Sequence, residues 1–269
     1  MQTTCLIDAH VHFYGCYDRR LFFDGAAGNF RKAAAKLGLD RAEGWLLFTE
    51  TAGDHYFRQF KAEAEAGEPG GADGWRFAAT ADPCALKARR GDGAELTLIA
   101  GRQIVTAERL EVLALGCDRT FDDGLPLQAT LDAARGAGAV AVLPWAFGKW
   151  LGARGRRVAA ALETAGSAGA DGFYLGDNGG RPWIMPTPTP FARAAALGIP
   201  VLPGSDPLPL AGEAGGAGRF GFVLDGGVDP ARPTAGLKAW LAEQSAPLRR
   251  FGRLESLTRF CRNQIALRV

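Results

Sequence analysis

The stretch Leu6-Ile-Asp-Ala-His10-Val-His12 is an apolar run that ends in two histidines separated by one residue. Such a run is typical of a buried β-strand, and side chains two apart on a strand point the same way. His10 and His12 can therefore coordinate the same metal ion, since neutral imidazoles bind zinc at about 2.0–2.1 Å. The alternative is a pair of structural histidines at a strand end. The chain has three histidines, and two of them lie here.

A second apolar run, Ile199–Leu202, also leads into a polar group, in Pro203-Gly204-Ser205-Asp206. Asp206 can complete a metal site with the two histidines, or act as a base for a bound water. The alternative is local turn chemistry, as a helix N-cap or an Asx-turn before Pro207. If both runs are parallel strands, their carboxyl ends meet, and we expect the three side chains to converge.

Short apolar runs alternate with helical patterns along the whole chain. The expected strands are Cys5–Ala9, Trp45–Thr49, Arg76–Thr80, Leu96–Ala100, Leu110–Leu115, Val140–Leu143, Gly172–Leu175, Ile199–Leu202 and Phe220–Leu224. The expected helices are Phe30–Leu37, Tyr56–Ala66, Leu127–Arg135, Gly152–Ala165, Phe191–Leu197 and Ala246–Ile265. This alternation predicts parallel βαβ units, in a barrel or a doubly wound sheet. No composition break divides the sequence, so we expect a single α/β domain over residues 1–269.

Composition excludes several classes of protein. Hydrophobic residues make up 47% and charged residues 22% of the 269 residues, which is the balance of a soluble globular protein. The net charge of +2 gives no strong signal for nucleic acid or an anionic membrane. We expect no membrane span and no signal peptide, because the apolar runs are short and the first residues lack a basic segment. Five scattered cysteines without CxxC spacing indicate reduced thiols and a cytoplasmic protein.

Cationic residues follow two of the expected strands. Lys149 and Arg154 come after Val140–Leu143, in a loop punctuated by glycine, and Arg181 comes after Gly172–Leu175. Active sites of α/β barrels lie at the carboxyl ends of the strands, so these side chains can hold a phosphate or carboxylate. The alternatives are a solvated first helical turn for the loop and turn chemistry around Arg181.

The order of these motifs resembles the polymerase and histidinol phosphatase (PHP) superfamily of metal-dependent phosphoesterases. Five segments in the family's order carry the resemblance: Leu6–His12 (family "DxHxH"), Leu98–Gly116 ("iPGiEitt…vHiLgl"), Gly138–Phe147 ("GgvavlaHPf"), Asp171–Asn178 ("dgiEvyN") and Gly204–Asp206 ("GSDaH"). The segments span nearly the whole chain. The resemblance implies one distorted (β/α)7 barrel, a PHP-like barrel domain, with a metal centre at its mouth.

Several metal ligands of the family are replaced in this chain. The family Glu falls on Gln103, and family histidines fall on Glu111, Trp145 and Leu208. The Thr-Asp-His after the second strand becomes Thr-Glu-Thr around Glu50, with His55 a few residues beyond. His10, His12 and Asp206 remain, and Glu111, Glu50 or His55 can add a ligand. We therefore expect about one zinc, manganese or iron(II) ion in place of the family's two or three. We also expect Trp145 and Leu208 to line the same cleft.

The sequence thus favours a PHP-like metal-dependent hydrolase, of a phosphoester in the leading interpretation, acting on a small-molecule substrate. In that interpretation Asp206 and the cations Lys149, Arg154 and Arg181 serve catalysis, the cations by offsetting charge on the transferred group. Two other functions stay open. One is a catalytically silent protein of the same fold that binds a ligand or a partner. The other is an amidohydrolase that cleaves C–N bonds, a superfamily that also opens with His-x-His. The sequence leaves the oligomeric state open.

Overall fold

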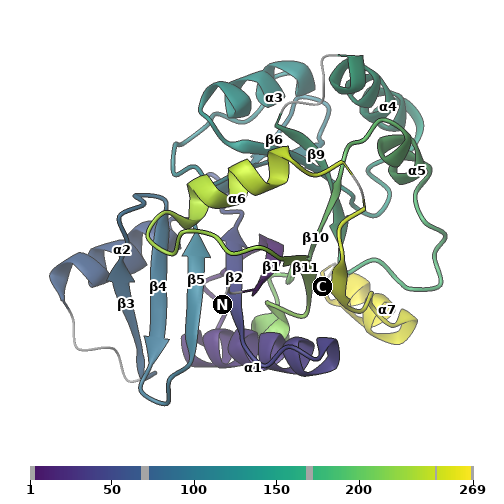
Figure 1. The fold of residues 1–269 in the computed structure, drawn as a ribbon. Helices are drawn as coiled ribbons and strands as arrows, with labels where there is room; N and C mark the ends of the chain where they lie inside the picture. The colour runs from purple at the N-terminus through teal and green to yellow at the C-terminus, as the bar shows by residue number, and fades with distance from the viewer. Residues whose placement is uncertain (1–3, 68–72, 168–171, 246, 268–269) are drawn as a thin grey trace.

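The computed structural model describes residues 4–67, 73–167, 172–245 and 247–267, and their strands form two mixed sheets (Figure 1). The larger sheet has the order β12-β11-β1-β2-β5-β4-β3. Its strands are β1 (Thr4–Val11), β2 (Ala42–Phe48), β3 (Trp75–Ala79), β4 (Ala85–Arg90), β5 (Glu95–Ile99), β11 (Phe220–Leu224) and β12 (Arg250–Gly252). The smaller sheet, of order β10-β9-β8-β7-β6, consists of β6 (Gly101–Val105), β7 (Glu111–Leu115), β8 (Val140–Pro144), β9 (Phe173–Asn178) and β10 (Val201–Gly204).

The expected single (β/α)7 barrel is wrong, because the strands form two mixed sheets that do not close into a barrel. Hairpins replace several of the expected helical crossovers. β4 and β5 pair antiparallel around Gly93, and β6 and β7 pair antiparallel around Arg109, both of which have positive φ. Among the described residues, the parallel strand pairs within the sheets are β1–β2, β2–β5, β8–β9 and β9–β10. The chain passes between the sheets at Ala100, where β5 ends and β6 begins.

Helices α1 and α2 pack on the larger sheet and α3, α4 and α5 on the smaller one, whereas α6 lies between the two sheets (Figure 1). Their bounds are α1 (Arg19–Leu37), α2 (Tyr56–Ala66), α3 (Leu127–Gly136), α4 (Gly152–Ser167), α5 (Thr189–Ala196), α6 (Pro233–Ala242) and α7 (Leu257–Ala266), with a 3-10 helix η1 (Ala211–Gly216). The larger sheet packs with α1 and α2 in one apolar core, and the smaller sheet packs with α3, α4 and α5 in another. A third core joins side chains of both sheets, such as Ile7 and Val142, to Leu237 of α6.

Two of the expected helices begin elsewhere in the structure. α1 begins at Arg19, well before the expected Phe30, because Asp18 caps it by accepting a hydrogen bond from the N–H of Leu21 at 2.8 Å. The expected helix Ala246–Ile265 is instead β12 followed by α7, and Ala246 lies outside the described residues. Four other expected helices are confirmed to within a few residues. In the described ranges, no helix combines the length and the apolar character needed to cross a membrane.

Candidate metal centre

His10 and His12 lie at the carboxyl end of β1, where a β-bulge interrupts the strand. Across the bulge, β1 has one residue more than β2 between paired positions, from Asp8 to Val11. Ala9 packs in the core between the sheets, whereas Val11 packs in the outer core of the larger sheet. The bulge therefore changes which face of the sheet the side chains after it point to. Bulges often redirect side chains in this way at functional sites. The two Nε2 atoms lie 3.1 Å apart.

Both imidazoles are buried, and burial lowers the pKa of each to about 4. The charge of His10 lowers the pKa of His12 further, because two imidazolium ions would repel each other. Both rings are therefore neutral near pH 7. A neutral imidazole has a free lone pair, so no proton must leave before it coordinates a metal.

Asp206 reaches the two histidines from the smaller sheet. It directly follows β10 and has φ of 46°, a left-handed conformation that aspartate tolerates better than most residues. Its Oδ1 lies 3.5 Å from the Nε2 of His10 and 3.5 Å from the Nε2 of His12. The Asn178 amide donates a hydrogen bond to Oδ2, which leaves Oδ1 to face the imidazoles. The convergence expected from the sequence is confirmed.

The three donor atoms have the spacing of ligands around one ion. Four tetrahedral ligands at about 2.05 Å from zinc lie about 3.3 Å from one another, and the three distances here are 3.1, 3.5 and 3.5 Å. Within the described ranges, no other three His, Cys, Asp or Glu side chains bring their donor atoms within 4.8 Å of one another. The donor set, two neutral imidazoles and one carboxylate, suits zinc, manganese or iron(II).

Asp8 joins the three chain segments that form the site. It is fully buried, and its Oδ1 accepts hydrogen bonds from the N–H of Ser205 at 2.8 Å and of His10 at 3.3 Å. Its Oδ2 accepts from the Ser205 hydroxyl at 2.5 Å and from the N–H of Gly218 at 2.7 Å. Burial raises the pKa of Asp8 to about 6, and these donors oppose the shift. Asp8 was not among the residues predicted for the site, although it is the acid of the segment that resembles "DxHxH" and an acid inside an apolar strand is itself a signal.

Three further residues contact the imidazoles. The Tyr14 ring stacks on His12, with centroids 5.2 Å apart, and the Thr49 hydroxyl lies 3.4 Å from the His12 Nε2. The Gln103 side chain hydrogen-bonds both imidazoles and raises their pKa values. Gln103 thus lies at the site while contributing no charge. The Nδ1 of His12 is buried without a hydrogen-bond partner among the described residues.

Glu111 and Lys149 form an ion pair next to this group. The negative charge of Glu111 raises the pKa of His10, whereas the positive charge of Lys149 lowers the pKa of His10 and of Asp206. Both side chains are therefore within electrostatic reach of the candidate ligands. The Lys149 side chain is 36% exposed, so it is partly open to solvent. Glu111 contacts this lysine, and it stands outside the group of three donors.

Glu50 and His55 are held by other partners. Glu50 is buried, and its Oε1 accepts a hydrogen bond from the N–H of Phe57 at 2.7 Å in the first turn of α2. Its Oε2 lies 3.2 Å from the Nη1 of Arg102, an atom that is also 3.3 Å from the His55 Nδ1. Neither Glu50 nor His55 joins the three donors, so a fourth protein ligand from this segment is not seen.

Arg154 and Arg181 also have structural partners. The Arg154 Nη2 donates to the carbonyl oxygen of Gly148 at 3.1 Å. Arg181 is 3% exposed and binds Asp177 through two hydrogen bonds of 3.0 Å, with Asp177 itself fully buried. These contacts fix the loops that follow β8 and β9. A role for either arginine in substrate binding stays a prediction.

A cavity of about 850 Å³ opens beside the loop that carries Lys149. Its walls are mainly apolar and come from that loop, from α4 and from the segment before α5. Trp145, Phe147 and Leu151 line it, whereas Lys149 pairs with Glu111 instead. Leu208 is not among the lining residues; its carbonyl oxygen accepts a hydrogen bond from the Tyr17 hydroxyl at 2.5 Å. The expectation that Trp145 and Leu208 share one cleft is therefore not met in this cavity.

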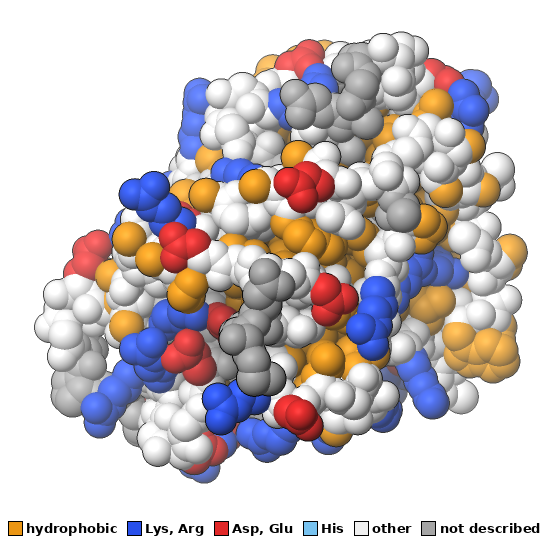
Figure 2. Space-filling model, in the orientation of Figure 1, with side chains coloured by type: hydrophobic (Ala, Val, Ile, Leu, Met, Phe, Trp, Pro, Cys, Tyr) orange, Lys and Arg blue, Asp and Glu red, His pale blue; other side chains and the backbone are white. Residues whose placement is uncertain are grey.

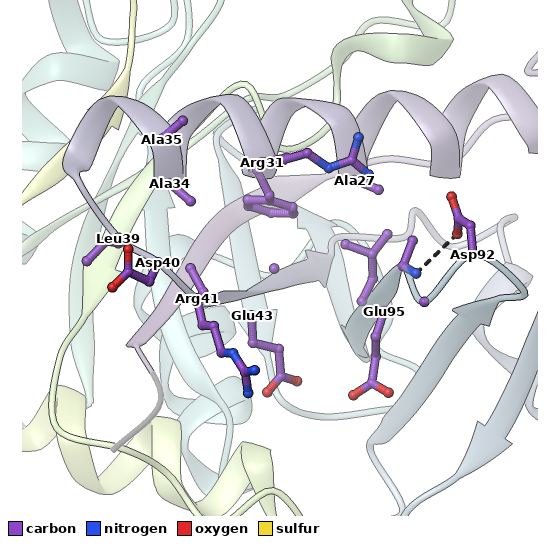
Figure 3. Close-up of a pocket in the computed structure, with 16 residues that line it drawn as sticks. Ala27, Arg31, Ala34, Ala35, Leu39, Asp40, Arg41, Glu43, Asp92 and Glu95 are labelled. Atoms are coloured by element: carbon purple, nitrogen blue, oxygen red, sulfur yellow. Dashed lines mark hydrogen bonds between the residues drawn. The ribbon is translucent and has the colours of Figure 1, made fainter. Parts of the chain in front are cut away.

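Another groove of about 850 Å³ lies between α1 and the first residues of β2 and β5 (Figure 3). Its lining contains both acidic and basic side chains, including Arg41, Glu43 and Glu95. β1 and β2 run parallel, and the histidines lie at the carboxyl end of β1. The groove is therefore at the opposite end of these strands from the candidate metal centre.

The fold of this chain is similar to that of a solved structure. No protein-family model and no curated protein matches the chain. Among solved structures, PsfC from Pseudomonas syringae PB-5123 is similar, with a TM-score of 0.54 over 98% of this chain and 99% of that one. The sequence identity is 13%, so the likeness concerns the fold alone.

Proposed function

We propose that this protein is a metal-dependent hydrolase of small phosphate esters that uses one divalent ion. The observation that supports it is the buried group of His10, His12 and Asp206, whose donor atoms lie 3.1–3.5 Å apart. Three protein ligands with an open fourth position are typical of catalytic rather than structural zinc sites. When bound, such an ion lowers the pKa of a coordinated water and polarises a phosphoryl oxygen.

The residues around the three donors have separate tasks in this proposal. Asn178 and Asp8 hold the two strands in position, Asn178 through Asp206 and Asp8 through Ser205. Lys149 supplies positive charge at the solvent side, where a phosphate dianion would approach. Tyr14 covers one face of His12 and limits the access of water.

The apolar cavity supports a substrate with an alkyl or aryl group. Lys149 lies between Phe147 and Leu151 on one loop, and these two residues line the apolar cavity. A substrate whose phosphate binds near Lys149 could therefore place its alkyl or aryl group against this apolar surface. Leu151 is 72% exposed and Phe147 is 53% exposed. Burying each methylene of a substrate against such a surface raises kcat/KM by about two- to fourfold.

The test combines metal analysis with a substrate panel. Protein purified without chelator or nickel affinity resin is analysed for bound metal. It is then assayed for phosphate release from ethyl, butyl, hexyl and phenyl phosphate with added zinc, manganese or iron(II). We expect about one ion per chain, faster hydrolysis of the longer esters, and no activity in His12→Ala. The Leu151→Glu variant should lose the chain-length preference, and Leu21→Glu, at a 60% exposed position on α1, should keep it.

Three results would overturn the proposal. A wild-type protein that retains no metal and releases no phosphate would favour the silent ligand-binding alternative. Hydrolysis of amides without hydrolysis of phosphate esters would favour the C–N hydrolase. Phosphate release that survives His12→Ala would show that the three donors are not the active site.

A further inference from the structure

A second cavity, of about 460 Å³, lies between α1, the start of β11 and the segment from β12 to α7. Its charged lining consists of six basic side chains and one acidic one: Lys32, Lys36, Arg219, Arg250, Arg253, Arg259 and Glu255. The whole chain has a net charge of only +2, so this is a local concentration of positive charge. In Figure 2, Lys and Arg side chains, with Asp and Glu among them, are visible on the side of the molecule where α1 and α7 lie in Figure 1, as they are on other parts of this face.

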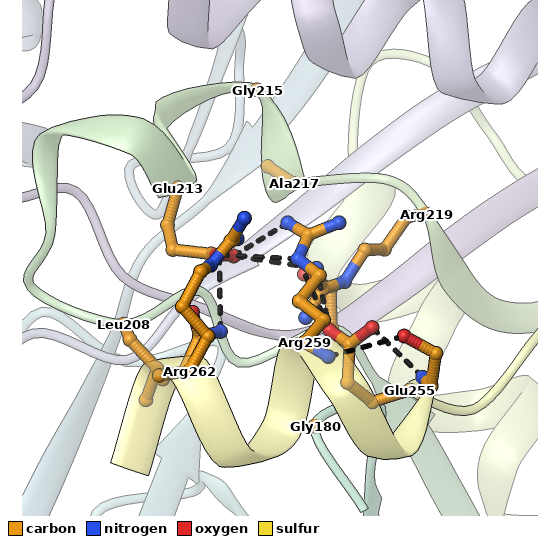
Figure 4. Close-up of polar contacts among 12 residues, drawn as sticks. Gly180, Leu208, Glu213, Gly215, Ala217, Arg219, Glu255, Arg259 and Arg262 are labelled. Atoms are coloured by element: carbon orange, nitrogen blue, oxygen red, sulfur yellow. Dashed lines mark hydrogen bonds and ion pairs between the residues drawn. The ribbon is translucent and has the colours of Figure 1, made fainter. Parts of the chain in front are cut away.

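Buried carboxylates fix two of the arginines. Arg259 lies 2.7 Å from an oxygen of Glu213 and 3.3 Å from one of Glu255, and Arg219 lies 3.3 Å from each acid (Figure 4). Glu213 is 1% exposed. Holding a guanidinium in place before a ligand arrives reduces the entropy lost on binding.

The third arginine is fixed in the same way by another acid. The Nη1 of Arg250 lies 3.1 Å from the Oδ2 of Asp177, which is fully buried and also binds Arg181. Each of the three carboxylates therefore contacts more than one arginine or other donor, and the surplus charge around the cavity stays positive.

The other three basic residues have no ion-pair or hydrogen-bond partner within the described ranges. Lys32 and Lys36 are four residues apart on α1, so their side chains lie on one face of the helix. Arg253 follows β12 on the opposite wall. Three unpaired cations from two walls therefore add to three arginines that are already paired with acids. The cavity has an excess of positive charge.

We propose that this cavity binds the diphosphate group of a small molecule. Guanidinium groups match phosphate oxygens in pairs, and flexible lysines add charge from one side. A single carboxylate would leave most of the cations unbalanced. The volume of about 460 Å³ lies within the range of small-molecule pockets.

The cavity adjoins the chain segment that orients Asp206, although the proposal does not depend on metal binding. Gly179 lines the cavity, and its N–H donates to the carbonyl oxygen of Gly204 at 2.7 Å. Asn178, the preceding residue, donates to the Asp206 carboxylate. A ligand in the cavity thus contacts the backbone beside the candidate metal centre without taking part in it.

The test is calorimetric titration of the metal-free protein with sodium pyrophosphate at constant ionic strength. We expect saturable binding to the wild type and a loss of about tenfold in affinity in Lys32→Gln/Lys36→Gln. The matched control is Arg20→Gln/Arg31→Gln, which removes the same charge from the same helix outside the cavity, and should bind within about twofold of the wild type. Arg253→Gln should weaken binding on its own.

The failure of this proposal is distinguishable from that of the metal-dependent activity. His12→Ala should bind pyrophosphate as the wild type does, because the cavity is lined by other residues. The proposal is overturned if the wild type shows no saturable binding at millimolar pyrophosphate. It is also overturned if the control double variant weakens binding as much as Lys32→Gln/Lys36→Gln. Thermal unfolding of each variant verifies that it is folded.

Discussion

The backbone N–H of Asp206 donates a hydrogen bond of 2.8 Å to the carbonyl oxygen of His10, and this bond joins the ends of strands from two different sheets. β1 belongs to the seven-stranded sheet and β10 to the five-stranded sheet. The candidate ligands therefore lie where the sheets meet, and their spacing depends on how the sheets pack.

Replacing His12 with Ala should abolish retention of metal. Removing one of three donors leaves two, which we expect to weaken metal binding by about 100-fold or more, since the loss of a mere supporting partner already costs 10- to 100-fold. The measurement is metal content after dialysis, with affinity by titration. His55→Ala is the matched control, because His55 lies outside the three donors and should not be needed. Equal loss in both variants would contradict the assignment.

The Asn178→Ala variant should bind metal about 10- to 100-fold more weakly than the wild type. Without the amide donor, Asp206 Oδ2 loses its hydrogen bond and the carboxylate can rotate away from the histidines. Gln128→Ala, which removes an exposed amide on α3, serves as the control. Unchanged metal affinity in Asn178→Ala, measured on folded protein, would show that Asp206 is oriented by other contacts.

Replacing Gly204 with Ala should destabilise the protein by about 1–3 kcal/mol and weaken metal binding. A Cβ at this position would lie 2.4 Å from both the Cβ and the backbone nitrogen of His10, so β10 would have to move away from β1. Gly28→Ala is the control, since a Cβ there meets nothing within 4 Å and glycine is unfavourable inside a helix. Chemical denaturation should show a loss of stability for the first variant and a small gain for the second.

Glu50 should make stability depend on pH. Burial raises the pKa of this carboxyl to about 7 from an ordinary value of 4.5, against the opposing effects of Phe57 and Arg102. Between those two values the folded state holds the proton and the unfolded state does not, so this contribution to stability falls as pH rises from about 4.5 to 7. Glu50→Gln removes the titration and keeps an acceptor for the Phe57 N–H.

The free energy of unfolding of Glu50→Gln, relative to the wild type, should therefore increase between pH 5 and pH 7.5, by of order 2 kcal/mol. Urea denaturation of both proteins at the two pH values measures it. Parallel pH dependences would mean that Arg102 and the Phe57 N–H keep Glu50 ionised in the folded protein.

Sequence patterns predicted the strands of the site better than their arrangement. The apolar runs before His10 and Asp206 located both strands, because a buried apolar run is a local signal. Each strand ends two residues later than expected, β1 at Val11 and β10 at Gly204. The same runs did not reveal the antiparallel pairing of β4 with β5 or of β6 with β7. That pairing depends on short turns, and the apolar pattern alone does not separate a hairpin from a crossover.

The partners of the candidate ligands were also hard to predict. Asn178 is the last residue of β9 and precedes two glycines in a turn-like sequence, so the sequence pattern gave no sign of its contact with Asp206. Glu50 lies at the end of β2, as a ligand would, but the first turn of α2 and Arg102 hold its oxygens. These contacts join segments that are far apart in the sequence, and the periodicity of a single segment gives no information about them.

The hydrogen bonds of Asp8 have a consequence for how the protein is made. Its partners Ser205 and Gly218 lie 197 and 210 residues away, so a nascent chain exposes both histidines long before these donors are synthesised. Until these donors are synthesised, burying the Asp8 carboxylate would cost free energy, because it would have no hydrogen-bond partner. Asp206 has not been synthesised at that stage either. Metal affinity should therefore arise late, after most of the chain has left the ribosome, and its onset would mark the completion of folding.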